Sequence, residues 1–435
     1  MATADAVLLG PGWIAAQRWF RAKARPVASV SPVDAIRLTD AVELRVVEVA
    51  YADGGETDRY LIPLAGGAEP HDGDGAYRAL VAAMAGGDEL PGHHGTLRCD
   101  ATPALAEFLP SARVAAAALA ERRLRVEQTN TSVVLGERLI LKLIRLVEPG
   151  LSPDVEVGRF LGEVEFAETP ALAGWATYRP AAGEPCSVAI LQAYAPSSGD
   201  AWAQVTGMLG AGDLAAATRV AGQVGALTRR LHDALASRPG EAAFPARVAT
   251  SAETGAWRAG AEAQLAAAIG SLGGAEHARL VVTADALRAR FADAFGRATG
   301  DARVARIHGD YHLGQLLATE RRHLVIDFEG EPARTLAERR APNSPLRDVA
   351  GMLRSFDYAV RTAGTRGEAA VDGGLAALRR AFLDGYGRIG VSDAALLEAF
   401  ELEKACYEIR YEANNRPAWL WLPLEAVERL AAGGA

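Results

Sequence analysis

The chain has 435 residues. That is longer than a chain with a single hydrophobic core usually is, so two or three packed units are expected. Half of the residues are hydrophobic, and alanine supplies much of that share, which favours helices. The net charge of -8, without a basic stripe, argues against a nucleic-acid partner, and no apolar run reaches the roughly 18 residues of a membrane span. The first residues lack the pattern of a signal peptide, and the three scattered cysteines (Cys99, Cys186, Cys406) suit a reducing cytoplasm and form no metal-ligand cluster.

Residues 1–95 are predicted to form a small β-rich cap. Nothing in this segment carries evident chemistry, so a unit that packs on the rest of the chain is the favoured interpretation. Glycine and proline punctuate its second half, which predicts loops around one helix. The expected elements are a short amphipathic segment at Trp13–Phe20, alternating strands at Ala41–Tyr51 and Arg59–Leu64 with a hairpin signal at Asp53-Gly54-Gly55 between them, and a helix at Tyr77–Met84.

Residues 96–199 are predicted to form a small, strand-rich lobe that contains one lysine, Lys142. Lys142 stands between apolar residues of a predicted strand, and a buried ammonium without a partner costs several kcal/mol. Only three of the 46 basic residues are lysine, so Lys142 marks a position that the planar fork of arginine would not fit. A strand-edge lysine that points to water is the alternative. The expected elements are helices at Thr102–Leu109 and Ser111–Glu121 and strands at Arg123–Glu127, Ser132–Leu135, Leu139–Ile144 and Cys186–Leu191.

From residue 200 onward, apolar residues recur every three and four positions, which predicts helices. Most of their apolar residues are expected to be core, and His232 is expected to be a packed or surface histidine and not a ligand. On the last helix one face carries Lys404, Glu408, Tyr411, Glu412 and Asn415, and a solvated charged face is the alternative to a binding site there. The expected helices are Trp202–Leu209, Asp213–Ser237, Ala252–Leu272, Glu276–Thr299, one that begins at Asp348, and Ala394–Arg416.

Two acids follow short apolar strands, in Arg306-Ile-His-Gly-Asp-Tyr-His-Leu-Gly-Gln315 and in Ile326-Asp-Phe-Glu-Gly-Glu-Pro332. Asp310 on its loop can take a proton from a hydroxyl. The oxygens of Gln315 and Asp327 make a site for Mg²⁺, which prefers carboxylates together with substrate phosphates. His-Gly-Asp alone is also an ordinary turn, but the pair of motifs at this spacing predicts a kinase-type phosphoryl-transfer site.

These motifs resemble those of the bacterial maltokinases, which belong to the aminoglycoside-phosphotransferase branch of the protein-kinase-like fold. The resemblance covers roughly three-quarters of the chain and continues in Gln128-Thr-Asn-Thr-Ser132, Leu141-Lys-Leu143, Ser344–Tyr358 and Tyr407-Glu-Ile-Arg-Tyr-Glu412. It implies an α+β, bilobal protein-kinase-like fold with an N-terminal β-rich cap and a mainly helical C-terminal lobe over residues 200–435.

The resemblance also implies roles for single residues around ATP and Mg²⁺. Lys142 would neutralise the ATP phosphates, held by Glu156, with Glu163 and Glu165 as alternatives. Ser132 ends the polar turn over the phosphates, and the backbone of Gln192–Tyr194 would pair with adenine, although an ordinary strand exit explains that segment equally well. His312 is assigned to the acceptor site. His308 and Asp348 are assigned to bracing the catalytic loop, with a helix-end acid as the alternative for Asp348.

The acceptor is predicted from a departure from the maltokinase pattern. After Glu412 this chain has Ala413-Asn-Asn415 where maltokinases typically continue with arginine. We interpret the change as leaving Glu412 free to meet an ammonium, which points to the actinobacterial glucosamine kinases of the same group, with Glu408, Tyr411 and Asn415 also at the sugar.

Three functional hypotheses follow. The first is a glucosamine kinase that makes the 6-phosphate, and the second is a maltokinase that makes maltose 1-phosphate. A catalytically inactive binding module is the hypothesis of another class, which the joint presence of Lys142, Asp310, Gln315 and Asp327 disfavours.

Overall fold

The computed structural model describes residues 9–109, 116, 118–124, 129–298, 300, 302–332, 334–364 and 368–432. The chain divides into two compact units, one ending at Pro196 and one beginning at Ser197. The break lies close to the expected boundary at residue 199, and the expected boundary at residue 95 falls within the first unit. Most of the predicted helix at Ser111–Glu121, and Gln128 of the polar turn, lie outside the described residues.

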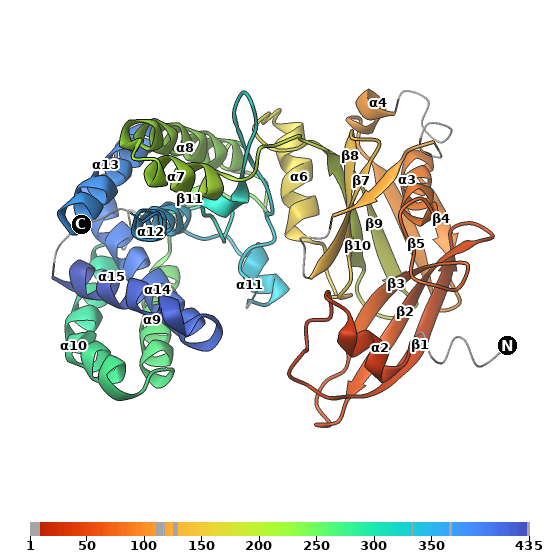
Figure 1. The fold of residues 1–435 in the computed structure, drawn as a ribbon, viewed down its shortest axis with the longest axis horizontal. Coiled ribbons are helices and arrows are strands. Elements are labelled where there is room, and N and C mark those ends of the chain that lie inside the picture. Colours follow the sequence, from red (N-terminus) through yellow and green to blue (C-terminus); the bar gives the residue numbers. More distant parts are fainter. Residues whose placement is uncertain are drawn as a thin grey trace. The chain divides into compact units, whose positions relative to one another are not determined.

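The first unit begins with a three-stranded antiparallel sheet in the order β1-β2-β3 (Figure 1). One face of this sheet packs on Ile14 of α2 and on Trp19 and Phe20, and the other joins the core around α3. The predicted strands and the predicted helix of this region are confirmed, and β1 is an addition. The elements are α2 (Pro11–Ala16), β1 (Val27–Arg37), β2 (Val42–Tyr51), β3 (Asp58–Ala65) and α3 (Ala76–Gly86).

A seven-stranded antiparallel sheet forms the rest of the first unit, in the order β4-β5-β9-β10-β8-β7-β6. In β8, Leu139, Leu141 and Leu143 point into the core, so the alternate face carries Lys142. The hairpin from β7 to β8 turns at Gly136 and Glu137, both with positive φ. The elements are β4 (Glu89–Pro91), β5 (Gly95–Ala101), α4 (Leu105–Phe108), β6 (Glu121–Arg123), β7 (Asn130–Leu135), β8 (Leu139–Ile144), α6 (Pro153–Glu163), β9 (Leu172–Pro180) and β10 (Cys186–Ala193).

A buried arginine joins the two sheets of the first unit. Arg145, which follows β8, is fully buried, and its guanidinium donates to Thr131 Oγ1, to the Leu61 carbonyl of β3 and to Glu69 Oε1, at 2.9, 3.3 and 2.7 Å. Removing one partner of such a buried pair leaves an uncompensated charge. The predicted cap is therefore fastened to the second sheet by ionic contacts as well as by the shared core.

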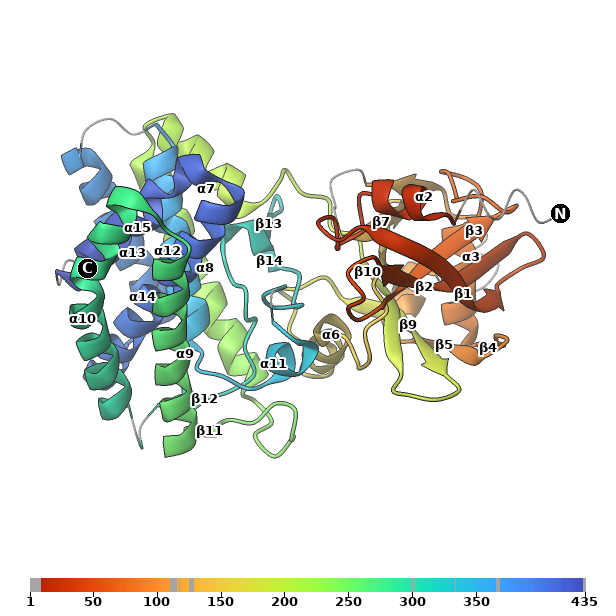
Figure 2. The same cartoon turned by 90° about the horizontal axis from the view of Figure 1, so that it is seen from below.

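The second unit is mainly helical, as predicted. Asp200 and Asp213 cap α7 and α8 by accepting from backbone N–H groups, and Thr250 and Glu253 form a capping box at α9. Helices α9 and α10 lie side by side, and α14 packs on both (Figure 2). The helices are α7 (Ala201–Gly210), α8 (Leu214–Leu235), α9 (Ser251–Gly270), α10 (Gly274–Arg297), α11 (Leu336–Arg340), α12 (Leu346–Thr362), α13 (Glu368–Tyr386), α14 (Val391–Asn415) and α15 (Trp421–Ala431).

Short strands and 3-10 turns carry the motif residues between these helices. The hairpin of β13 and β14 separates Gln315 from Asp327, which explains the spacing of the two motifs. None of the helices in the described ranges is both long and apolar enough to cross a membrane. The short elements are β11 (Arg247–Val248), β12 (Arg303–Val304), η1 (Leu313–Gln315), β13 (Leu316–Ala318), β14 (His323–Val325) and η2 (Pro417–Trp419).

Candidate active site

The loop that carries Asp310 is anchored to the first turn of α12 by a buried carboxylate. Asp348 Oδ2 accepts the backbone N–H of His308 at 2.8 Å, and Oδ1 accepts that of Gly309 at 2.9 Å. His232 Nε2 lies 3.1 Å from Asp348 Oδ2. Burial opposes ionisation of Asp348, but the bond from His232 and the backbone donors outweigh it and lower the pKa. Asp348 thus stays a carboxylate that can accept all three bonds.

The same face of α12 contacts the loop at two further points. Ser355 Oγ accepts the Leu313 N–H at 3.1 Å. A Cβ on Gly351 would lie 2.6 Å from the Tyr311 carbonyl oxygen, so only glycine lets the helix approach the loop this closely. Together with Asp348 these residues recur at the spacing of one helix face. The loop is therefore held by three residues on one face of α12.

His308 fixes the position of the second motif relative to the first. Its Nε2 donates to the Ile326 carbonyl at 2.9 Å, and its Nδ1 accepts the Asp310 N–H at 3.3 Å. The ring is therefore the neutral tautomer with the proton on Nε2. Because Ile326 precedes Asp327, this histidine ties the loops of the two acids together.

Gln315 and Asp327, the two predicted ligands of Mg²⁺, lie side by side. Gln315 Nε2 lies 3.2 Å from Asp327 Oδ2, and the two residues flank the β13–β14 hairpin. Asp327 adopts a φ of 64°, a left-handed backbone conformation that few non-glycine residues hold. An amide and a carboxylate side by side are the hard-oxygen donors that Mg²⁺ takes, so these residues fit the predicted ion.

The Asp310 carboxylate is contacted by a lysine that the sequence analysis did not assign to it. Lys404 Nζ of α14 lies 3.5 Å from Asp310 Oδ1 and 2.6 Å from Glu331 Oε1. Burial opposes ionisation of Glu331, but Lys404 and Arg334 outweigh it and lower its pKa to about 2. Burial likewise disfavours the charged form of Lys404, yet Glu331 and Asp310 raise its pKa. The three groups therefore form a charged cluster at the catalytic loop.

In the first unit, the part-buried Lys142 has an acidic partner. Its Nζ lies 3.3 Å from Asp154 Oδ2, in the first turn of α6, and the Asp154 side chain is 3% exposed. Glu156, the predicted partner, is half-buried two residues further along the same helix. Asp154 therefore joins the predicted Glu156 of the same helix as a candidate partner of the lysine.

Of the other residues predicted to bind the nucleotide, Ser132 and Gln192 lie on strands and Tyr194 directly follows β10. Ser132 is buried within β7, opposite Lys142 in the ladder, and Gln192 lies near the end of β10. The N–H of Tyr194 donates to the Arg138 carbonyl at 2.8 Å. That donor is thus engaged within the unit, and an adenine partner would have to use other backbone groups of this segment.

A cavity of about 620 Å³ opens beside the catalytic loop in the second unit. It combines the predicted base with a row of side chains from α14, and Trp202 and Trp419 add aromatic surface that suits the apolar face of a sugar. Burial lowers the pKa of His312, so its imidazole is neutral here, and its Nδ1 accepts the Gly314 N–H at 3.0 Å. The lining includes Asp310, His312, Tyr358, Lys404, Tyr407, Glu408, Tyr411, Glu412, Arg416, Trp202 and Trp419.

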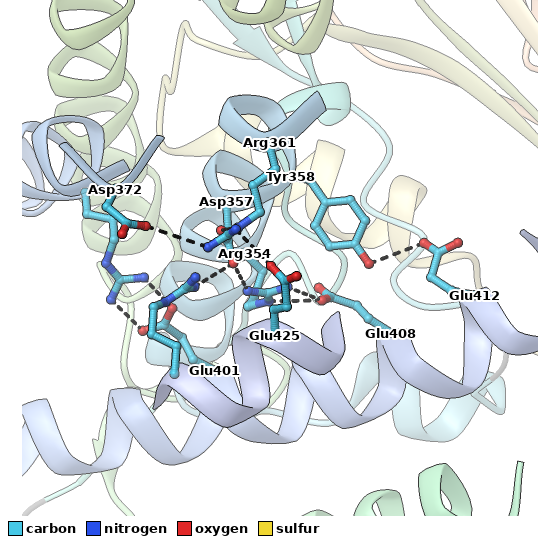
Figure 3. Close-up of polar contacts among 11 residues, drawn as sticks. Arg354, Asp357, Tyr358, Arg361, Asp372, Glu401, Glu408, Glu412 and Glu425 are labelled. Carbon is cyan, nitrogen blue, oxygen red and sulfur yellow. Dashed lines mark hydrogen bonds and ion pairs between the residues drawn. The ribbon is translucent and has the colours of Figure 1, made fainter. Parts of the chain in front are cut away.

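Behind the cavity wall, α12, α13, α14 and α15 are joined by an ion-pair network (Figure 3). Arg354 is buried and donates to Glu408 Oε2 through Nε and Nη2, at 2.9 and 2.7 Å, and to Asp357 Oδ2 at 2.5 Å. Burial raises the pKa of Glu408, and Arg354 opposes that shift. Because Arg354 engages Oε2 twice, the orientation of the Glu408 carboxylate in the cavity wall is fixed.

Two expectations for this helix need correction. Glu412 was expected to be free of a neighbouring cation, but Arg416, one turn further on, donates to both of its carboxylate oxygens at 2.9 and 2.6 Å. Tyr358 Oη also lies 3.3 Å from Glu412 Oε1. Asn415 is exposed, bonds the Tyr411 carbonyl of its own helix, and is absent from the described lining of the cavity. The spacing of Glu412 and Arg416 is the usual one for a helical ion pair, a signal that was available in the sequence.

Comparison with protein-family models gives two matches. The model described as the maltokinase N-terminal cap domain matches residues 13–100, and that of the phosphotransferase enzyme family matches residues 121–396. The second match spans more than half of the chain. The chain belongs to the phosphotransferase enzyme family.

Relatives of this phosphotransferase include two curated glucosamine kinases. The protein from Streptacidiphilus jiangxiensis is 32% identical over 91% of either chain, and that from Mycolicibacterium smegmatis is 30% identical over 72% of this chain and 80% of the relative. A solved structure of a glucosamine kinase with glucosamine, ADP and inorganic phosphate superposes with a TM-score of 0.73 at 27% identity, covering 99% of both chains.

These findings confirm several predictions. The maltokinase-like branch, the α+β kinase-like fold with its cap, and the class of an ATP-dependent phosphotransferase with a sugar acceptor are confirmed. The roles of the single site residues stay predictions.

Proposed function

We propose that this phosphotransferase transfers the γ-phosphoryl group of ATP to the 6-hydroxyl of glucosamine, in the cytoplasm. The observation that carries the proposal is the cavity that holds Asp310 together with Glu408 and Glu412. Along α14 the two acids lie one and two turns beyond Lys404, which contacts Asp310, so they are about 6 and 12 Å further along the helix axis. The glucosamine kinases among its relatives support the same acceptor.

The spacing suits an amino sugar that is bound at both ends. The amino group on C2 and the hydroxyl on C6 lie on different sides of the pyranose ring, so the hydroxyl can reach Asp310 while the ammonium meets an acid of α14. Glu408 suits this role because Arg354 holds only its Oε2. Arg416 is about half exposed, so a cationic sugar can displace it from Glu412.

In the proposed reaction Asp310 orients the sugar hydroxyl and takes its proton as the oxygen attacks the γ-phosphorus. The bond from that phosphorus to the bridging β-oxygen breaks, and ADP leaves. Lys142, held by Asp154 and in our proposal by Glu156, neutralises ATP phosphates, and the segment of Gln192 and Tyr194 together with Ser132 serves the nucleotide. Mg²⁺ held by Gln315 and Asp327 would offset the charge of the phosphates.

A maltokinase activity is the second candidate, because the cap domain matches the maltokinase cap model. A disaccharide would extend further along α14, toward Glu412 and Trp419. The contacts of Lys142 with Asp154 and of Gln315 with Asp327 disfavour the hypothesis of a catalytically inactive binding module, because such a module does not need these polar pairs for activity.

The test is an acceptor panel with ATP and Mg²⁺, read as ADP release. We expect kcat/KM for glucosamine to exceed that for glucose and maltose at least about tenfold, the range that a site loses when a polar group is unpaired. Phosphorus NMR of the product should identify a 6-phosphate. Glu408→Gln should raise KM for glucosamine more than for glucose, because only the amino sugar carries the charge. Preference for maltose would replace this proposal with the second candidate.

The role of Asp310 is tested separately with Asp310→Asn. We expect kcat to fall about 100-fold or more, because the amide cannot accept the proton. Calorimetric ATP affinity should change little, since the residue serves the acceptor. A kcat within about tenfold of the wild type would show that another group is the base.

A further inference from the structure

We propose that Lys404 is a positioning residue of the phosphoryl transfer, which acts by holding the Asp310 carboxylate. The proposal rests on the proposed phosphoryl transfer but not on which sugar is the acceptor. Among the residues that the structure describes, Lys404 is the only side chain within ion-pair or hydrogen-bond distance of the Asp310 carboxylate. The contact is to Oδ1, so Oδ2 is left for the sugar hydroxyl.

The surroundings of Lys404 hold its ammonium in place. Glu331 Oε1 is the nearer acceptor at 2.6 Å, and Arg334 Nε holds Glu331 Oε2 at 2.8 Å. The Tyr407 ring lies under the ammonium, with its centroid 4.6 Å from Nζ. The lysine side chain is 22% exposed and Glu331 is 10% exposed, so solvent screens this cluster only partly. An ammonium with three donors can bind both acids at once while it faces the ring.

The composition of the chain gives an independent argument. Of 46 basic residues only three are lysine, and the chain places arginine at almost every other position where a positive charge is needed. Lys404 borders both the acceptor cavity and a smaller one of about 60 Å³ beneath the catalytic loop. A planar guanidinium there can still pair with Glu331, but its larger fork would fill the space beside Asp310. We therefore infer that lysine occupies this position because its small ammonium leaves the space beside Asp310 open.

The competing explanation is that Lys404 only forms a structural ion pair between α14 and the loop after Asp327. Two single variants and one double-mutant cycle distinguish the two explanations. With the best acceptor from the panel, Lys404→Met should lower kcat about 30- to 100-fold, while the KM for ATP stays within about threefold. Lys404→Arg keeps the charge and the pair with Glu331, so it should retain the melting temperature but recover less than about a tenth of kcat. Lys23→Met is the matched control, because Lys23 is an exposed lysine of the first unit that donates to backbone carbonyls. It should leave kcat unchanged.

The decisive measurement is a double-mutant cycle with Asp310→Asn, read as single-turnover rates. If Lys404 acts through Asp310, adding Lys404→Met to Asp310→Asn should lower the residual rate less than about twofold. An equal loss in both backgrounds would overturn the proposal, and so would wild-type kcat in Lys404→Arg. Loss of activity in Asp310→Asn alone tests the proposed function, so the failure of one idea is distinguishable from that of the other.

Discussion

The substitution Asp348→Asn tests how the catalytic loop is held. The carboxylate accepts three hydrogen bonds, from the N–H groups of His308 and Gly309 and from His232. An asparagine has one acceptor oxygen, which best replaces Oδ2 because that oxygen receives two donors. Its NH₂ group then faces the Gly309 N–H, which loses its partner.

The magnitude follows from these contacts. One unsatisfied buried donor costs about 1–3 kcal/mol, and the two remaining bonds lose the charge that strengthened them, so we expect a local destabilisation of about 2–4 kcal/mol. Asp310 follows Gly309 directly, and a displacement of about 1 Å at a reacting group costs about 100-fold in rate. We therefore expect kcat to fall about 100-fold while the affinity for ATP changes little.

Amide hydrogen exchange is the suitable assay, because it reports the His308 and Gly309 amides and not the unfolding of either unit as a whole. Exchange at both amides should accelerate, and the ADP-release assay should show the loss of kcat. Asp372→Asn is the matched control, since that acid is 58% exposed and lies 3.9 Å from Arg361, and its removal should change stability by less than about 0.5 kcal/mol. Unchanged protection in Asp348→Asn, with kcat within about threefold of the wild type, would refute the bracing role.

Two further predictions concern the same loop. Burial lowers the pKa of His312, so below about pH 6.5 the unfolded chain binds a proton that the folded chain does not, and stability falls with falling pH by up to about 1.4 kcal/mol per unit. His312→Asn should flatten this dependence in denaturation curves recorded between about pH 5 and 7, and an unchanged slope would contradict it. Gly351→Ala places a Cβ 2.6 Å from the Tyr311 carbonyl and should destabilise the protein by about 1–3 kcal/mol. Gly207→Ala in α7, where a Cβ has open space, is its control and should be neutral or stabilising in the same thermal melts.

Where the sequence carried a short-range signal, its predictions match the structure. Strand β2 follows from alternating apolar residues, β3 and β8 follow from short apolar runs, and the long helices follow from apolar spacing of three and four. Strand β1 was missed because its residues are polar or exposed over much of its length and include Pro32, so its extended form comes from pairing with β2.

In the candidate active site, too, short-range sequence signals predicted some features and tertiary packing set the others. The sequence by itself identified the candidate residues for phosphoryl transfer, because Asp310, Gln315 and Asp327 stand in two short motifs whose spacing is that of a single hairpin. It could also have shown the pair of Glu412 and Arg416, which lie one helical turn apart.

Only the tertiary structure decided which charges meet across distant segments. Lys404 reaches Asp310 from 94 residues away, and Lys142 contacts Asp154 of α6, a partner that no sequence pattern had indicated. Such contacts depend on the rotation of one helix relative to a loop or strand, and a helix turns each successive residue by about 100°. Hydrophobic periodicity identifies the buried face, but the packing of the whole unit selects the partner of each charged side chain.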